Sequence, residues 1–220
     1  MHGETVSNLD LFTDAEPAPV EHLGTHAYVL RSFAQPGHDL LAGVEAVVLD
    51  APFRHMVTPG GYTMSVALTN CGRLGWTTDP SGYRYTAQDP LTGRPWPAMP
   101  SAFAQVARAA ARAAGFDSFE PDACLVNRYL PGARLSLHQD KDELDYSAPI
   151  VSVSLGMAAT FLFGGKTRSE PTAKVHLRHG DVVVWGGEDR LRYHGVAPLK
   201  DVPHPLLGAQ RINLTFRKAG

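Results

Sequence analysis

The sequence predicts a mainly β fold with flanking helices, an α+β arrangement built on a sandwich or jelly roll. Short apolar strands recur through the second half of the chain, at intervals typical of such folds. The composition agrees, because 17 prolines and 21 glycines among 220 residues favour a chain with many turns. The predicted strands cover residues 123–129, 150–155, 160–163, 182–185 and 212–216.

The first half of the chain predicts one strand, one helix and a flap. Residues 1–20 are polar, so we expect a loose tail, and residues 27–33 are apolar enough for a strand. Apolar residues at helical spacing predict a helix over residues 39–49 that faces the core. Residues 56–85 mix aromatic, glycine and basic residues around a turn signal at residues 59–61, which predicts hairpins or a flap.

A second helix is the clearest element before the strands. It begins at Pro100-Ser101, where Ser101 is the expected N-cap, and alanines fill its interior. Gly115 is the expected end. Phe103, Val106 and Ala110 share one face of this helix, so that face should pack on the core.

Charge and cysteine content narrow the class of protein. The net charge of −2 excludes a whole-molecule attraction to nucleic acid, so any such binding needs a local basic patch. Two cysteines, Cys71 and Cys124, cannot build a disulfide framework or a CxxC zinc site. Since there is no signal-like or membrane-spanning apolar run, we expect a cytoplasmic protein without membrane contact.

A possible metal site is the sharpest local feature. His138 and Asp140 are two residues apart, so an extended segment would point both side chains the same way. His194, before a glycine at a strand end, could supply a third ligand. Two histidines and one carboxylate with open positions opposite are typical of non-heme iron(II) oxygenases. The His-x-Asp pattern alone is weak, and a solvated surface pair is the alternative.

The last strand carries a second constellation. Arg211, Asn213 and Arg217 alternate with apolar residues, and two arginine forks suit a dicarboxylate. The alternative is a strand whose polar face meets solvent. Asn127 and Tyr129, on one face of an earlier strand, could complete the hydrogen bonding of a carboxylate or could be a polar pair satisfied by backbone.

Together these residues resemble the AlkB family of oxidative demethylases. The resemblance runs from about Leu9 almost to the C-terminus, although residues 1–8 have no counterpart and residues 166–174 match weakly. It includes the metal and arginine motifs and four further stretches, at residues 56–66, 74–78, 95–100 and 180–188.

The resemblance implies a double-stranded β-helix (jelly-roll) core with an N-terminal nucleotide-recognition lid. Residues 21–220 would form a single dioxygenase domain, with the lid at about 50–95 and the catalytic core at about 120–220. It further implies that Fe(II) is held by His138, Asp140 and His194, and 2-oxoglutarate by Asn127, Tyr129, Arg211, Asn213 and Arg217.

The implied reaction is direct reversal of alkylation damage in DNA, with RNA as a second substrate. O2 and 2-oxoglutarate would be consumed, bases such as 1-methyladenine and 3-methylcytosine demethylated, and formaldehyde, succinate and CO2 released. The base must leave the stack, and Trp76 is the expected platform for it, opposite His138. The other expected substrate contacts are Thr58, Tyr83, Lys141, Asp142 and Arg168.

Nucleic-acid binding also needs cations near the lid. Between residues 54 and 94 four arginines outnumber two acids, which predicts a modest basic patch. We expect Trp96 and Trp185 to serve packing. No segment suggests assembly, so we expect a monomer without an obligate protein partner.

Two other functions remain open at this point. An oxygenase of the same fold could act on a protein side chain or a small molecule, and would not need an aromatic, basic lid. A damage-binding module without catalysis is the other alternative, although it would not need a metal site with open positions.

Overall fold

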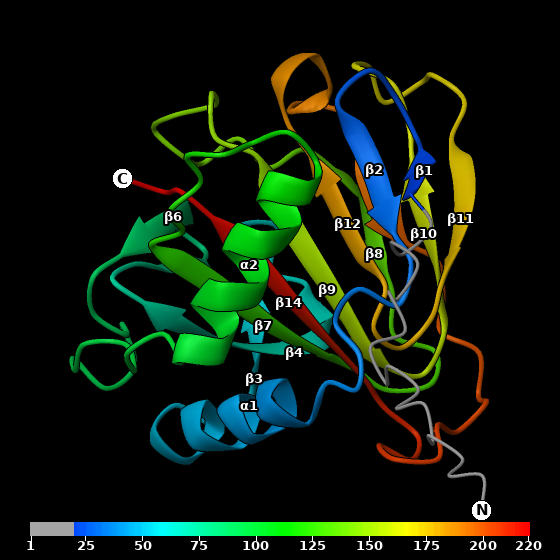
Figure 1. Ribbon diagram of the computed structural model, residues 1–220. Helices are drawn as coiled ribbons and strands as arrows, with labels where there is room; N and C mark the ends of the chain where they lie inside the picture. Colours follow the sequence, from blue (N-terminus) through cyan, green and yellow to red (C-terminus); the bar gives the residue numbers. More distant parts are fainter. Residues whose placement is uncertain (1–19) are drawn as a thin grey trace, which may run out of the picture.

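The computed structural model describes residues 20–220, which form antiparallel sheets and two helices (Figure 1). The helices are α1 (His38–Asp50) and α2 (Ser101–Ala113). The strands are β1 (Val20–His22), β2 (Ala27–Leu30), β3 (Arg54–Val57), β4 (Thr63–Gly72), β5 (Gly75–Asp79), β6 (Gly82–Thr86), β7 (Ala123–Tyr129), β8 (Leu135–His138), β9 (Ile150–Gly156), β10 (Ala159–Phe163), β11 (Ala173–Leu177), β12 (Val182–Trp185), β13 (His194–Val196) and β14 (Arg211–Arg217).

Two sheets face each other as in a jelly roll. The large sheet has the order β1-β2-β12-β9-β14-β7-β4-β3, and the small sheet has the order β11-β10-β13-β8. From β7 to β10, and again from β11 to β14, consecutive strands of the chain alternate between the two sheets. The expected mainly β fold with flanking helices is therefore confirmed.

Alternate side chains of β14 point to opposite faces of the large sheet, so this strand contributes to two layers of the molecule. Ile212, Leu214 and Phe216 point to one side of the large sheet, into a core that α1 and α2 complete. Figure 1 shows both helices covering that outer face. The other face of the large sheet packs on the small sheet through Phe163, Trp185 and their neighbours. The polar residues of β14 therefore lie between the two sheets.

Both predicted helices are confirmed, but the predicted cap of the second is wrong. Pro100 occupies the N-cap position of α2 with extended backbone angles, and Ser101 is already the first helical residue. The Pro100 carbonyl accepts hydrogen bonds from Phe103 and Ala104 in place of a side-chain cap. The helix ends as expected, because Gly115 adopts a φ of 85° and its N–H donates to the carbonyl of an earlier residue.

The predicted strands agree with the structure to within one or two residues, with one exception. The strand expected over residues 27–33 ends at Leu30, because Ser32 adopts a φ of 55° and its N–H donates to Asp181. The stretch 56–85 forms hairpins, as predicted. Its first hairpin, β3–β4, joins the edge of the large sheet through β7, whereas β5–β6 is a separate two-stranded sheet.

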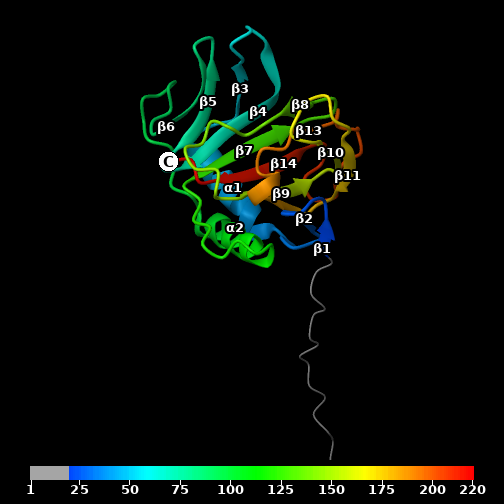
Figure 2. The same ribbon diagram turned by 90° about the horizontal axis from the view of Figure 1, so that it is seen from above.

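Both hairpins project on the same side of the molecule, beyond the ends of β7 and β8 (Figure 2). The large sheet also takes β2, β3 and β4 from before residue 120. The division into a lid at 50–95 and a core at 120–220 thus remains a prediction about function.

The tail expected over residues 1–20 lies outside the described residues except for Val20. Within residues 20–220, neither helix has the length and apolar character that a bilayer crossing requires.

Candidate active site

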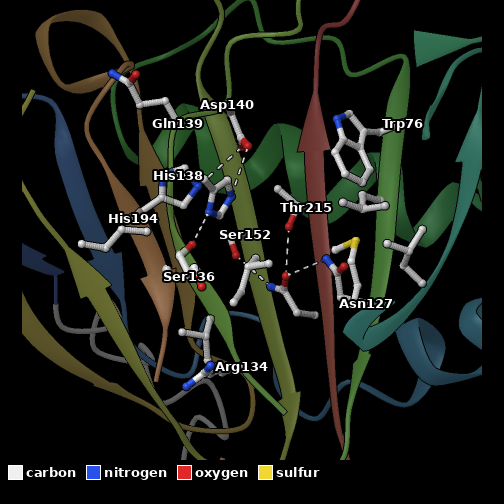
Figure 3. A pocket seen from close by; sticks show the side chains of 18 of the residues that line it. Trp76, Asn127, Arg134, Ser136, His138, Gln139, Asp140, Ser152, His194 and Thr215 are labelled. Carbon is white, nitrogen blue, oxygen red and sulfur yellow. Dashed lines mark hydrogen bonds and ion pairs between the residues drawn. The ribbon is translucent and has the colours of Figure 1, made fainter. Parts of the chain in front are cut away.

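A cavity of about 740 Å³ opens between the two sheets, beneath the hairpins (Figure 3). Polar side chains of β14, β7 and β9 form one wall, and β8, β13 and the segment after β8 form the other. Every residue that the sequence predicted for a site lines this cavity: Thr58, Trp76, Tyr83, Asn127, Tyr129, His138, Asp140, Lys141, Asp142, Arg168, His194, Arg211, Asn213 and Arg217.

The three predicted metal ligands meet at one end of the cavity. His138 ends β8 and His194 begins β13, and the two are direct partners in the small sheet. Their Nε2 atoms lie 3.6 Å and 3.7 Å from the two carboxylate oxygens of Asp140. One ligand atom from each residue lies within 4.8 Å of the others, a spacing that suits a single metal ion.

Backbone carbonyls orient both imidazoles. The Nδ1 atom of His138 lies 2.9 Å from the carbonyl oxygen of Ser136, and that of His194 lies 3.1 Å from the carbonyl oxygen of Arg192. With the proton on Nδ1, each Nε2 keeps its lone pair for a metal. Burial and the neighbouring His138 lower the pKa of His194 to about 3, so this ring is neutral at pH 7.

A buried arginine holds the metal carboxylate. Arg217 donates from Nε and Nη2 to Oδ2 of Asp140, at 2.8 Å and 2.6 Å. Burial would raise the pKa of Asp140, but the charge of Arg217 and its hydrogen bonds to the carboxylate outweigh burial and hold that pKa below its ordinary range. Asp140 is therefore an anion, and its Oδ1 accepts no hydrogen bond from the described residues.

The other arginine of the strand occupies the opposite end of β14. Arg211 is 1% exposed, and its guanidinium lies over the ring of Tyr129, 4.9 Å from the centroid. One nitrogen donates to Ser154 at 2.9 Å, but Nε and Nη1 are buried with no partner among the described residues. Burial lowers the pKa of Arg211. Two buried donors without a partner suit an anionic ligand, such as one carboxylate of a bound dicarboxylate.

A hydrogen-bonded floor connects the two ends. Asn213 donates to the hydroxyl of Ser152 at 2.8 Å and accepts from Thr215 at 2.9 Å and from Asn127 at 3.3 Å. The sequence reasoning missed Ser152 and Thr215. The signal for Ser152 was a polar residue at every second position of the otherwise apolar strand β9, a strand buried along its length.

Two stacked aromatic rings line the cavity on the hairpin side. Trp76 and Tyr83 stack with centroids 5.6 Å apart and planes 18° apart. The indole Nε1 of Trp76 donates to Asp142 at 2.8 Å. In Figure 3 the indole lies on the opposite side of the pocket from the histidines. Trp76 is thus a cavity residue, as expected of a base-stacking platform.

Three unpaired cations surround the mouth. Arg134, Lys141 and Arg168 are exposed, line the cavity and take part in no ion pair among the described residues. The guanidinium of Arg168 rests over Tyr193, 5.3 Å from the ring centroid. Thr58, at the turn of the first hairpin, accepts a hydrogen bond from the N–H of Tyr62.

Three of the four arginines of the basic patch expected between residues 54 and 94 form ion pairs in the structure. Arg54 pairs with Asp89 at 2.6 Å, and Arg84 pairs with Asp79 at 2.5 Å. A third arginine of the segment, Arg73, pairs with Asp122 at 2.7 Å. These ion pairs brace the hairpins and the C-terminal end.

The two tryptophans assigned to packing differ in place. Trp96 is buried beneath β5, and its Nε1 donates to the carbonyl of Thr86. Trp185 is also buried, yet it lines the cavity and its ring meets His194 edge-on with centroids 4.9 Å apart. Trp185 therefore also shapes the wall behind a predicted metal ligand.

Comparisons with known proteins agree with this geometry. The family model of the 2OG-Fe(II) oxygenase superfamily matches residues 26–217. Two relatives carry the name alpha-ketoglutarate-dependent dioxygenase AlkB. The one from Salmonella typhimurium is 62% identical over 96% of this chain and 98% of its own length. The one from Escherichia coli is 60% identical, again over 96% and 98%.

More distant proteins share the fold. The mouse protein named nucleic acid dioxygenase ALKBH1 is 35% identical over 60% of this chain and 33% of its own length. The solved structure of OsALKBH1 superposes with a TM-score of 0.79 at 29% identity, covering 91% of this chain and all of that one. From the family model and the full-length relatives, the chain belongs to the 2OG-Fe(II) oxygenase superfamily and, within it, to the AlkB family of alpha-ketoglutarate-dependent dioxygenases.

Proposed function

We propose that this dioxygenase demethylates alkylated bases of DNA, and of RNA as a second substrate. The observation that carries the proposal is the meeting of three features in one cavity. The metal triad occupies one end, the orphaned donors of Arg211 the other, and the indole of Trp76 lies across the pocket from the triad (Figure 3). A substrate with a flat aromatic face would lie between the indole and His138.

The donor set fits iron(II) and 2-oxoglutarate. When bound, they supply with O2 the oxidation of an N-methyl group, which leaves as formaldehyde while succinate and CO2 are formed. His138, Asp140 and His194 would hold the metal. Arg217 keeps Asp140 ionised and aimed at the histidines.

The guanidinium of Arg211 would bind the distal carboxylate of the co-substrate. Tyr129 and Asn213 border the same channel, and Asn127 lies beside them. The separation of the two arginines along β14 gives each end of the co-substrate its own cation, so one orientation is favoured.

The lid residues suit a flipped base. An alkylated base that cannot pair leaves the stack at low cost, and Trp76 offers it an aromatic face. Bases such as 1-methyladenine and 3-methylcytosine are cationic, which an indole face attracts by up to about 2 kcal/mol. The carboxylate of Asp142, at the edge of the indole, adds opposite charge. The name of the mouse relative, a nucleic acid dioxygenase, supports this substrate class.

The nucleic-acid strand would lie across the mouth. Lys141 and Arg168, which line the cavity, would contact its phosphates, and Thr58 and Tyr83 would contact the nucleotide from the hairpin side. We further propose that the protein acts as a monomer in the cytoplasm.

The deciding experiment is mass spectrometry of an oligonucleotide with one 1-methyladenine, incubated with protein, Fe(II), ascorbate and O2, with and without 2-oxoglutarate. We expect the loss of one methyl group only when 2-oxoglutarate is present. Succinate release with an unchanged oligonucleotide would move the substrate to another class, such as a protein side chain. No succinate with any substrate would favour a damage-binding module.

A further inference from the structure

Asp142 and Glu143, which follow the metal motif in the chain, each accept a hydrogen bond from an aromatic side chain of the β5–β6 hairpin. Trp76 on β5 and Tyr85 on β6 are direct partners in the hairpin, so their side chains share a face. The indole of Trp76 donates to Asp142 at 2.8 Å, and the hydroxyl of Tyr85 donates to Glu143 at 2.7 Å. The hairpin is thus fastened to the segment that immediately follows Asp140.

Glu143 is the buried member of this pair of acids. Its side chain is 2% exposed, and each of its oxygens faces a buried arginine. Arg190 donates to Oε2 at 3.1 Å, and Nε of Arg217 lies 3.3 Å from Oε1. A carboxylate so far from water needs such partners, and the Tyr85 hydroxyl is the one that comes from the lid.

The two arginines carry the connection onward to the metal carboxylate. Arg190 donates to the backbone carbonyl of Asp140 at 2.8 Å and to that of Ala148 at 3.0 Å. Arg217 grips the carboxylate of Asp140 itself. Two acids and two arginines therefore form a buried group with no net charge, which burial tolerates better than an unpaired ion.

We infer that Glu143 is a positioning residue that couples the lid to the metal end of the cavity. Through Tyr85 it fixes the hairpin that carries Trp76, and through Arg217 it fixes Asp140. The inference rests on the proposed function of the cavity, because the coupling matters only if the base and the co-substrate bind at these two places. Burial raises the pKa of the Tyr85 hydroxyl well above its ordinary value, so this group remains a donor.

A purely structural cluster predicts a different outcome from a coupling. Tyr85→Phe removes one hydroxyl and leaves both arginines on Glu143. If the cluster serves stability alone, the variant melts at a lower temperature, and KM for the oligonucleotide and KM for 2-oxoglutarate change by the same factor or not at all. If Tyr85 holds the lid, the base-binding wall loosens while the co-substrate end stays intact.

The first test compares Tyr85→Phe with Tyr28→Phe, a matched control. Tyr28 lies on β2, across the molecule from β6 (Figure 1), and donates its hydroxyl to the carbonyl of Thr25. For Tyr85→Phe we expect KM for a methylated oligonucleotide to rise about tenfold, the scale of one lost hydrogen bond to a charged group, and KM for 2-oxoglutarate to change less than about twofold. Tyr28→Phe should change neither.

The second test is spectroscopic and needs no turnover. The indole N–H of Trp76 gives an NMR signal that reports its bond to Asp142, and Trp96 and Trp185 give internal references. In Tyr85→Phe the Trp76 signal should shift and broaden, while the two reference signals stay in place. Tyr28→Phe should leave all three unchanged.

Glu143→Gln should have the opposite effect, with KM for 2-oxoglutarate changed more than KM for the oligonucleotide. The glutamine can still accept from Tyr85, but it removes the charge that faces Arg217. We expect KM for 2-oxoglutarate to rise about tenfold, from the same loss of a charged partner, and more than the oligonucleotide KM rises. Melting curves establish that each variant is folded, and Glu143→Asp, which shortens the reach to Tyr85, replaces Tyr85→Phe if that variant does not fold.

The outcomes distinguish the inference from the proposed function. A wild-type protein that demethylates, with Tyr85→Phe equal to Tyr28→Phe in both KM and the Trp76 signal, overturns the coupling. A wild-type protein that fails to demethylate overturns the proposed function instead. In that case the NMR comparison still decides whether Glu143 and Tyr85 fix the indole.

Discussion

Asp140 has two roles, one in metal binding and one in stability, and a single substitution removes both. It is a predicted metal ligand and also the acid that neutralises the buried Arg217. Asp140→Ala should therefore abolish succinate release and lower the free energy of unfolding by about 3 kcal/mol, because it leaves a buried arginine short of a partner. Urea denaturation and a succinate assay measure the two effects. Undiminished turnover would refute the metal assignment.

Trp76 gives the clearest separation of the two binding events. Trp76→Ala removes the ring that faces the histidines, and one stacked base is worth about 1–3 kcal/mol, so KM for a methylated oligonucleotide should rise about 5- to 150-fold. Trp76→Phe keeps a stacking face but loses the donor to Asp142. Its oligonucleotide KM should therefore lie between those of the wild type and of Trp76→Ala. Equal activity of all three proteins on oligonucleotides would favour a small-molecule substrate.

At the scale of elements, the β5–β6 hairpin is placed by a close approach at Gly75. A Cβ there would lie 2.5 Å from the Trp96 indole and 2.8 Å from Cβ of Asn70. Asn70 also clamps the backbone of Trp76 by two hydrogen bonds. Gly75→Ala should therefore push the hairpin outward, lower stability by about 1–3 kcal/mol and raise the oligonucleotide KM.

The control for this prediction is Gly93→Ala, at a loop glycine whose added Cβ would meet no atom within 4 Å. Its φ of 68° costs some stability but leaves the lid in place. Thermal unfolding and oligonucleotide KM should separate the two variants. A Gly75→Ala protein that binds oligonucleotide as well as Gly93→Ala would show that the position of the hairpin does not limit substrate binding.

The elements also show how far local sequence reasoning reaches. Hydrophobic period and turn residues predicted the helices and most strands, because these signals act over a few residues. The N-cap of α2 was wrong because a proline carbonyl took the place that Ser101 was expected to fill. Pairing of the lid arginines could not be predicted from a charge count. Arg73, for example, meets Asp122 only through the tertiary fold.

The same limit applies to the candidate site. Motif spacing predicted the metal triad, and alternation predicted the polar face of β14, since both depend on the period of an extended strand. Glu143 was not found, because an acid next to Asp142 reads as part of a solvated loop. Only its burial against Arg190 and Arg217 gives it a role.

For the whole molecule, burial of a neutral histidine makes stability depend on pH. The pKa of His194 is about 3 in the folded chain and 6.5 in its ordinary state, so the unfolded chain binds more protons between these values. The contribution is complete above pH 6.5 and is lost as the pH falls. The metal-free protein should lose about 2 kcal/mol from this residue between pH 7 and pH 5.

Urea denaturation of metal-free protein at both pH values measures this loss. His194→Asn, which cannot titrate, is the matched variant, and the loss should be about 2 kcal/mol smaller for it. Equal pH dependence in the two proteins would mean that His194 is protonated as readily in the folded chain as in the unfolded one.

The overall charge makes a last prediction, on the salt dependence of nucleic-acid binding. The net charge is −2, and the lid arginines Arg54 and Arg84 form ion pairs with Asp89 and Asp79. Among residues 20–220, three cations that line the mouth then have no ion pair: Arg134, Lys141 and Arg168. For a single strand, three phosphate contacts give a slope of about −2 in log K against log salt, or about a twentyfold loss of affinity from 50 to 200 mM.

Fluorescence anisotropy with a labelled single strand measures this slope, and Arg168→Ala should make it shallower by about 0.7. A slope steeper than about −5 would mean seven or more phosphate contacts, more than the mouth supplies. The paired arginines of the hairpins would then have to exchange their aspartates for phosphates on binding. With the shallow slope, affinity depends chiefly on the flipped base between Trp76 and His138, and selection for damage follows from the cavity and not from attraction to the backbone.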